Sequence, residues 1–421
     1  MFYVKIPDKK ECSFNGEIII PKENDLFYIP LVIGIDDNLT VIVKKGDIVN
    51  QGDKIANTKG DFKTNVISSV NGEVIGFEEK IYLNNKKVKC AVIKKIKEDT
   101  LFENARKNIN DFSKEEFVDI LKNGGIIGLG GAAFPSHVKY SNTKEIKTLI
   151  VNAVECESYI TADQKILLSK IEEILEATDA ILDIFDIPEA IIVVKSKNQK
   201  LREAIDDFVG TYLKIKVEFV KNHYTMGYEK NIIKEVLNIE YDKIPIEKGI
   251  IVNNVSTIYA IYEMLKKNKP LFERMVTFTG DGLDKPCNVV AKSGMLVKDI
   301  VKQIGGYTSD DITLVAGGPM MGTSVESDDL VISPNLNTVL VLKDYKKEEE
   351  KECFRCGRCT TSCTVKISPV LIKEAGDDKN KLKDLRPDKC VECGLCSYIC
   401  PAKIPIREYV REAKLKMEDA K

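Results

Sequence analysis

The stretch from Cys353 to Pro401 decides how the C-terminal part of this chain folds. It contains two similar runs, CFRCGRCTTSC from Cys353 to Cys363 and CVECGLCSYICP from Cys390 to Pro401. Each run has the spacing C-x2-C-x2-C-x3-C, which is typical of proteins with two [4Fe-4S] clusters, where the fourth cysteine of one run ligates the cluster of the other. The spacing therefore predicts two clusters within one small domain.

The crossed pattern divides the eight cysteines into two ligand sets. The first set is Cys353, Cys356, Cys359 and Cys400, and the second is Cys390, Cys393, Cys396 and Cys363. Gly357 and Gly394 let the backbone bend between ligands and point amides at the sulfurs. Zinc is the alternative, but a zinc site uses four ligands and has no use for eight in this duplicated spacing.

Length, charge and hydropathy exclude several other classes of protein. The 421 residues predict two to three domains at about 150 residues each. Lys and Arg number 63 against 65 Asp and Glu, so no global field favours nucleic acid or anionic lipid. No apolar run approaches the ~20 residues of a membrane span, and the first twenty residues lack an export signal. We expect a cytoplasmic protein that reaches a membrane only through partner proteins.

Strand and helix patterns divide the chain into four regions: 1–100, 101–270, 271–342 and 343–421. Glycine-punctuated strands from Tyr28 to Ile96 predict a half-barrel similar to the biotinyl/lipoyl type. We favour a structural barrel, with a lipoylated arm on Lys59 or Lys63 as the alternative.

From Thr148 to Lys266 strand-like and helix-like segments alternate, which predicts parallel strands with crossover helices. A helix with a capping box at Ser113 and Glu116 precedes them. The segment Glu273 to Val341 is rich in strands and turns. The charged run Lys343 to Glu352 is interpreted as a solvated linker or helix face.

A glycine-rich loop, Gly128-Leu-Gly-Gly-Ala-Ala-Phe134-Pro135, follows the capped helix. It formally satisfies G-x-G-x-x-A, but Pro135 stands where a dinucleotide-binding fingerprint should continue into a helix. The loop backbone could still approach a flat or phosphorylated ligand closely, and Lys139 could add a cationic contact. A packing turn is the alternative.

An acidic loop, Asn152-Ala-Val-Glu155-Cys-Glu157, lies just after a predicted parallel strand, where open α/β sheets place their ligands. Two carboxylates separated by one residue suit ribityl or ribose hydroxyls. General acid–base chemistry and plain surface acids are the alternatives. His137 and His223 are interpreted as packed or surface residues rather than catalysts.

These motifs, in this order along the chain, resemble the RnfC family, the peripheral subunit of the Rnf electron-transport complex. The resemblance rests on GLGGAAFPSHVK, VNAVECESYITAD, VTFTGD, AGGPMMG and CVECGLCSYICPAKIPI. It implies an α/β multidomain protein with a lipoyl-like half-barrel, an α/β flavin and NADH domain, a β-grasp domain of the soluble ligand-binding type, and a helical two-cluster domain. By the same resemblance the flavin and NADH site is formed by Gly128, Gly130, Gly131, Phe134, Lys139, Asn152, Glu155 and Glu157.

The function implied by the resemblance is oxidation of NADH through FMN, followed by transfer of single electrons through the two clusters to a partner. FMN suits this role because it accepts two electrons and releases them one at a time. The partners would be Rnf membrane subunits, with the chain peripheral on the cytoplasmic face. Two alternatives are an RnfC-like paralogue such as PrdC, which feeds a soluble proline reductase, and a wiring module without flavin. No catalytic residue is assigned.

Overall fold

A parallel sheet of mostly apolar strands forms the second region of the computed structural model, which describes residues 4–60, 62–103, 108–141, 145–196, 199–346 and 348–418. Strands β9 (Thr148–Ala153), β10 (Glu189–Lys195), β11 (Ile215–Val220) and β12 (Ile250–Asn254) are all parallel, in the order β11-β10-β9-β12. Both faces of a parallel sheet are covered, which explains the continuous apolar composition. The predicted strand and helix alternation is confirmed.

Helices cover the two faces of this sheet unequally. Leu149 and Val151 face the larger group of helices, whereas Ile150 faces the other side and packs with α7 (Glu229–Leu237). The larger group consists of α2 (Lys114–Asn123), α3 (Ser136–Ser141), α4 (Ala162–Ser169), α5 (Ile171–Phe185), α6 (Gln199–Val209) and α8 (Val255–Lys267). Helix α2 begins with the predicted capping box, because Ser113 Oγ accepts from Glu116 N at 3.2 Å and Glu116 Oε2 accepts from Ser113 N at 2.8 Å.

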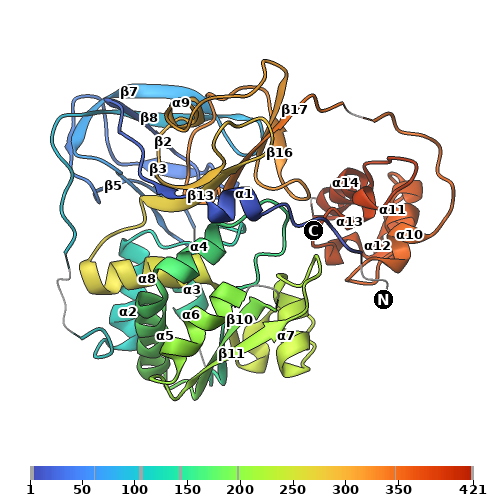
Figure 1. The fold of residues 1–421 in the computed structure, drawn as a ribbon, viewed down its shortest axis with the longest axis horizontal. Coiled ribbons are helices and arrows are strands. Elements are labelled where there is room, and N and C mark those ends of the chain that lie inside the picture. Colours follow the sequence, from blue (N-terminus) through green and yellow to red (C-terminus); the bar gives the residue numbers. More distant parts are fainter. Residues whose placement is uncertain are drawn as a thin grey trace.

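The barrel and the β-rich third region share one hydrophobic core. Phe27 and Ile93 of the barrel pack in the same buried cluster as Phe278 and Val289 of the third region. The barrel consists of β2 (Leu26–Pro30), β3 (Leu39–Val41), β4 (Ile48–Val49), β5 (Lys54–Thr58), β6 (Asn65–Ile67), β7 (Gly72–Ile81) and β8 (Lys87–Lys95), in the sheets β2-β8-β7-β4 and β3-β5-β6. The two regions therefore form one body above the α/β sheet (Figure 1).

The third region is a mixed sheet in the order β1-β14-β13-β17-β15-β16, with one helix, α9 (Val297–Gln303). Its strands are β13 (Glu273–Thr279), β14 (Cys287–Lys292), β15 (Ile312–Ala316), β16 (Thr323–Val325) and β17 (Thr338–Lys343). The edge strand β1 (Ile18–Ile19) comes from the N-terminus and pairs in parallel with β14, after the short helix α1 (Glu11–Asn15). The N-terminal segment therefore lies outside the barrel that follows it in the sequence.

The two cysteine runs lie in a small helical body beside the rest of the molecule (Figure 1). Its core includes Leu382, Ile404 and Val410. Its helices are α10 (Arg358–Thr361), α11 (Pro369–Ala375), α12 (Lys379–Leu385), α13 (Leu395–Tyr398) and α14 (Ile406–Glu418), and 3-10 turns occupy Pro387–Lys389 here and Pro245–Lys248 in the α/β region. The described residues between 344 and 352 lie outside helices and strands, consistent with the predicted linker.

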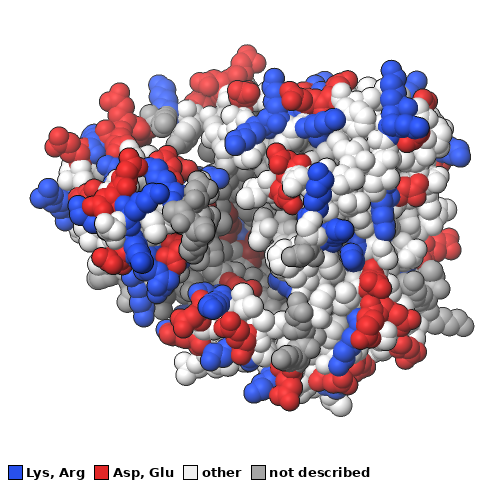
Figure 2. Space-filling model, turned by 180° about the vertical axis from the view of Figure 1, so that it is seen from behind, with Lys and Arg blue, Asp and Glu red and all other residues white. Residues whose placement is uncertain are grey.

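Charges of both signs are interspersed over the face seen from behind, and a hollow separates the small body from the larger one (Figure 2). This distribution agrees with the near balance of acids and bases in the sequence. Among the described helices, none has both the length and the apolar composition of a membrane span.

Candidate functional site

The glycine loop is closed by backbone pairing and leads into α3 directly after Pro135. Gly128 N donates to Phe134 O at 2.8 Å, and Ser136 N donates to Ile126 O at 2.9 Å. Gly131 has a φ of 117°, a region that favours glycine. A Cβ at Gly130 would lie 3.3 Å from Asn254 Cβ, so the loop approaches β12 closely because it lacks side chains there.

This loop borders a cavity of about 310 Å³ at the carboxyl ends of β9 and β12, the edge at which open parallel sheets bind their ligands. The sequence-predicted residues that line the cavity are Gly128, Gly130, Phe134, Lys139, Asn152, Glu155 and Glu157. Gly131 is in the same loop but is not among the lining residues. The structure thus brings the glycine loop and the acidic loop together around one space.

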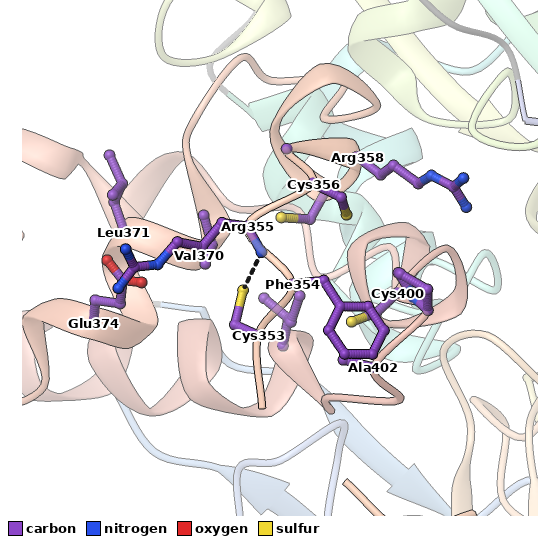
Figure 3. Close-up of a pocket in the computed structure, with 14 residues that line it drawn as sticks. Cys353, Phe354, Arg355, Cys356, Arg358, Val370, Leu371, Glu374, Cys400 and Ala402 are labelled. Carbon is purple, nitrogen blue, oxygen red and sulfur yellow. Dashed lines mark hydrogen bonds between the residues drawn. The ribbon is translucent and has the colours of Figure 1, made fainter. Parts of the chain in front are cut away.

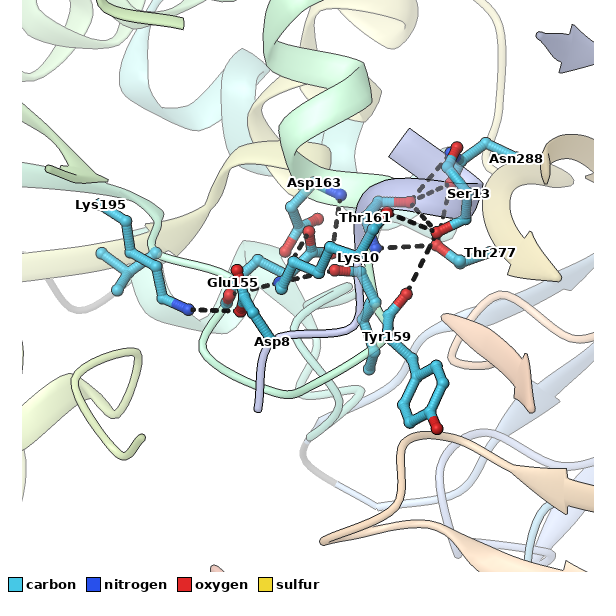
Figure 4. Close-up of polar contacts among 12 residues, drawn as sticks. Asp8, Lys10, Ser13, Glu155, Tyr159, Thr161, Asp163, Lys195, Thr277 and Asn288 are labelled. Carbon is cyan, nitrogen blue, oxygen red and sulfur yellow. Dashed lines mark hydrogen bonds and ion pairs between the residues drawn. The ribbon is translucent and has the colours of Figure 1, made fainter. Parts of the chain in front are cut away.

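The side chain of Glu155 is 5% exposed and incompletely hydrogen-bonded. Its Oε1 accepts from Asp163 N at 3.1 Å, whereas Oε2 has no hydrogen-bond partner among the described residues. The ammonium of Lys10 lies 3.7 Å from Oε2 (Figure 4). The pKa of Glu155 is raised to about 7: burial is the main cause and the charge of Asp163 adds to it, whereas Lys10, the N–H of Asp163 and Lys195 oppose the shift. Glu155 therefore lines the cavity with one carboxylate oxygen, Oε2, that is buried beside Lys10 and accepts no hydrogen bond from the described residues.

Glu157 binds the backbone of the third region. Its Oε1 accepts from Met320 N at 2.7 Å and from Met321 N at 2.8 Å. A Cβ at Gly318 would collide with this carboxylate, which explains the glycine in the sequence AGGPMMG. Burial raises the pKa of Glu157, and the two N–H groups oppose that shift. Both acids of the acidic loop line the cavity, but backbone N–H groups hold Glu157, whereas Glu155 Oε2 has no hydrogen-bond partner among the described residues.

Other candidate residues are held by backbone groups. Asn152 Nδ2 donates to Gly227 O at 2.9 Å, and Lys139 Nζ donates to Val252 O at 2.8 Å. Burial lowers the pKa of Lys139. His137 is buried in α3, where burial and then Lys122 lower its pKa, and neither it nor His223 lines the cavity. The interpretation of both histidines as noncatalytic packed or surface residues agrees with these positions.

Sequence reasoning missed several residues of the cavity. Tyr224 and Tyr228 come from the loop after β11, and their rings meet edge to face with centroids 6.4 Å apart. Cys156 also lines the cavity, as do Asp163, Asn254, Thr257, Met321 and Asn337. These tyrosines could have been predicted from the sequence, because the loop after β11, like the acidic loop, follows the carboxyl end of a parallel strand.

The first ligand set surrounds a second cavity, of about 420 Å³, in the helical body. Figure 3 shows the sulfurs of Cys353, Cys356 and Cys400 around an open space, and Cys359 also lines it. Arg355 N lies 3.4 Å from Cys353 Sγ and donates a weak hydrogen bond to it. Cys353 and Cys356 are exposed, whereas Cys359 and Cys400 are buried. The four cysteines from both runs thus meet, as the crossed pattern requires.

The second ligand set is also gathered in one place. Burial raises the pKa of the Cys396 thiol to about 12, with added contributions from the charges of Cys393, Cys390 and Cys363. Glu392 N donates to Cys390 Sγ at 3.4 Å, matching the bond at Cys353 in the first run. Eight cysteines in two sets of four, with this duplicated spacing, fit two [4Fe-4S] clusters better than zinc.

The helical body contacts the first cavity through the second run. Tyr224 OH donates to Cys393 O at 2.6 Å, and Arg407 Nη1 donates to Met320 O at 2.6 Å. A Cβ at Gly394 would collide with Met320 O, whereas one at Gly357 would meet nothing within 4 Å. The second ligand set therefore lies beside the cavity. Of the two equivalent glycines, Gly394 is restricted by the contact with Met320 and Gly357 is not.

Four protein families match successive parts of the chain. The RnfC barrel sandwich hybrid domain matches residues 3–98, the Nuo51 FMN-binding domain 121–263, the SLBB domain 275–324, and the 4Fe-4S dicluster domain 349–404. These matches confirm the predicted fold class and the two predicted kinds of cofactor, FMN and iron–sulfur clusters. The eight cysteines lie in the dicluster region, and the glycine and acidic loops lie in the FMN-binding region.

Similar curated proteins cover almost the whole chain. The C subunit of the proton-translocating ferredoxin:NAD(+) oxidoreductase complex of Clostridium ljungdahlii is 30% identical, over 97% of this chain and 91% of that protein. The C subunit of the Na(+)-translocating ferredoxin:NAD(+) oxidoreductase complex of Acetobacterium woodii is 29% identical, over 87% and 85%. The crystal structure of an NAD+-reducing [NiFe]-hydrogenase in the H2-reduced state has a TM-score of 0.51 at 17% identity, over 73% of this chain and 63% of that chain, and shows the fold alone.

The first prediction concerns the buried carboxyl of Glu155. Its pKa of about 7, against an ordinary 4.5, means that the folded chain binds an extra proton between these values, so the stability contributed by this group falls as the pH rises from 4.5 to 7. Glu155→Gln in the flavin-free chain should raise the free energy of unfolding by up to about 3 kcal/mol at pH 8 and by little at pH 4.5. Denaturant unfolding at both pH values measures this, and an equal effect at both would contradict it.

The second prediction compares two glycines that occupy equivalent positions in the two runs. Gly357 and Gly394 have φ values of 71° and 76°, so an alanine at either should cost about 1 kcal/mol in backbone strain. Only Gly394→Ala should also displace the helical body from Met320. Limited proteolysis of the 344–352 linker should therefore become faster in Gly394→Ala than in Gly357→Ala. Equal cleavage rates would show that this contact does not hold the helical body.

Proposed function

This chain belongs to the RnfC family, whose members are the C subunits of ion-translocating ferredoxin:NAD(+) oxidoreductases, and on that basis we propose that it is the NADH-oxidising electron-transfer subunit of such a complex. The proposal is supported by 30% identity to the Clostridium ljungdahlii protein over 97% of this chain. The FMN-binding and dicluster domains together supply a two-electron site and a one-electron route. The protein acts with the other subunits of its complex.

The residues around the first cavity fit FMN. The side-chain-free glycine backbone allows close approach by a flat or phosphorylated group, and the carboxylate of Glu155, which lines the cavity, would be an acceptor for a hydroxyl. Lys139, Asn152 and Phe134 would complete the wall of the site. When bound there, FMN supplies the exchange between electron pairs from NADH and single electrons for the clusters. Gly131 would act through the loop conformation, because it does not line the cavity.

The position of Tyr224, between the first cavity and the second ligand set, is the main support for the proposed electron route. Its side chain lines the first cavity, and its hydroxyl group donates to the carbonyl oxygen of Cys393 at 2.6 Å. One residue thus separates the proposed flavin site from the second ligand set. Met320 and Leu395 pack with Tyr224 in the same buried cluster. This packing keeps the second set next to the proposed flavin site.

The first ligand set is the proposed contact with the next protein. Cys353 and Cys356 are exposed, and the ring of Phe354 between them is 59% exposed. The order of sites would therefore be flavin cavity, second set, first set and protein surface. Another iron–sulfur protein of the same complex is the proposed partner, and any membrane association would be made through the complex's membrane subunits.

The proposed activity predicts both cofactors and their coupling. Anaerobically reconstituted protein should contain about eight irons per chain, for two [4Fe-4S] clusters, together with bound FMN. Addition of NADH should bleach the flavin absorbance and then the cluster absorbance, as followed by stopped-flow spectroscopy. Protein that holds the irons but neither binds FMN nor reacts with NADH would instead support the wiring module.

Paired cysteine variants test the order of the two clusters. Cys353→Ser with Cys356→Ser, and Cys393→Ser with Cys396→Ser, should each remove one cluster and about four irons. NADH should still reduce the cluster that remains in the first variant, because the second set lies beside the cavity. It should reduce the remaining cluster of the second variant at least tenfold more slowly. Equal rates in the two variants would overturn the proposed order.

A further inference from the structure

The N-terminal segment lies across the acidic loop as a strap, here defined as residues 4–16. Backbone atoms fix its path, since Pro7 O accepts from Ser158 Oγ at 2.6 Å and Asp8 O accepts from Tyr159 N at 2.9 Å. Further along, Ser13 O accepts from Asn288 Nδ2 at 2.9 Å. The strap is thus bound to the flavin region at one end and to the third region at the other (Figure 4).

Two side chains of the strap make reciprocal ion pairs with the flavin region. Lys10 Nζ lies 3.7 Å from Glu155 Oε2, and Asp8 Oδ1 lies 3.7 Å from Lys195 Nζ. Lys10 also donates to Glu155 O at 2.8 Å and to Ile160 O at 2.6 Å, and its side chain is only 7% exposed. These bonds to carbonyl groups hold the ammonium in place next to the Glu155 carboxylate.

Four charged groups from different elements act on Glu155. Asp163 of α4 raises its pKa, whereas Lys10 of the strap and Lys195 of β10 lower it. Arg274 of β13 is also coupled to the charge of Glu155. Among the described residues only Lys10 forms an ion pair with the carboxylate within 4 Å. Lys10 is therefore the principal local charge that favours the ionised form of this acid.

We propose that Lys10 is a positioning residue for the flavin site: its ammonium favours the ionised form of Glu155, and the carboxylate accepts a hydrogen bond from the ribityl chain of the bound flavin. The inference rests on the proposed function, because it names the regulation of the same site. The strap would then contribute to ligand binding, although it is far from the glycine loop in the sequence. Lys10 itself is not among the residues that line the cavity.

The inference has a definite pH dependence. With Lys10 present, the pKa of Glu155 is about 7, so binding through the carboxylate should strengthen as the pH rises through 7. Without Lys10 the pKa should be higher, and the same strengthening should occur at a higher pH. At pH 7, a rise of one unit in the pKa would lower the ionised fraction of the carboxyl about fivefold, from about one half to about one tenth.

The test measures the dissociation constant of FMN from pH 5.5 to 9, by quenching of flavin fluorescence with the full flavin-free chain. Lys10→Met should weaken binding at pH 7 by about three- to tenfold and should approach the wild-type value near pH 9. Lys10→Arg should restore most of the affinity. Lys9→Met is the matched control, since it removes the same charge from the preceding residue, whose side chain is exposed and lies over the Tyr159 ring.

Glu155→Gln separates this effect from a general structural one and from titration of the FMN phosphate. In the Glu155→Gln background, Lys10→Met should change the affinity less than twofold at every pH. A pH-independent loss of affinity in Lys10→Met, or an equal loss in the Glu155→Gln background, would overturn the inference. Failure of the wild-type chain to bind FMN would instead overturn the proposed function, so the two outcomes are distinguishable.

Discussion

The backbone of Met320, a residue of the third region, connects the flavin region to the helical body. Its N–H donates to the buried carboxylate of Glu157 in the flavin region, and its carbonyl oxygen accepts from Arg407 in the helical body. Gly394 leaves room for that carbonyl. Because each bond is made to main-chain atoms of one loop, the distance between the flavin cavity and the second ligand set is fixed by covalent geometry as well as by packing.

Buried polar groups at the centre of the molecule fall into two classes. Thr161, Thr277 and Asn288 form a fully hydrogen-bonded network where the strap meets the third region, which rigidifies that junction (Figure 4). By contrast, Glu155 Oε2 and Arg274 Nη2 have no hydrogen-bond partner among the described residues. Both of these residues line cavities, although the two unpaired atoms themselves are buried.

Much of the fold could be predicted because its signals are local. The capping box at Ser113, the alternation of apolar strands with helices, and the spacing of the eight cysteines each depend on residues a few positions apart. The acidic loop was placed at a ligand edge because it follows a parallel strand. The different roles of Glu155 and Glu157 could not be predicted, since they depend on which distant backbone reaches each carboxylate.

The cysteine spacing predicted iron–sulfur clusters and a crossed pairing of the two runs, because spacing within a run limits the ligand geometry, whereas FMN was implied by the resemblance of the motifs to a known family. The pattern did not reveal that Tyr224 links the flavin cavity to Cys393, or that Lys10 lies against Glu155. These contacts join residues that are 169 and 145 positions apart in the sequence. No local or periodic sequence pattern indicates that such distant residues are in contact. They exist because packing of separate regions places their side chains together, and that packing is a property of the assembled fold.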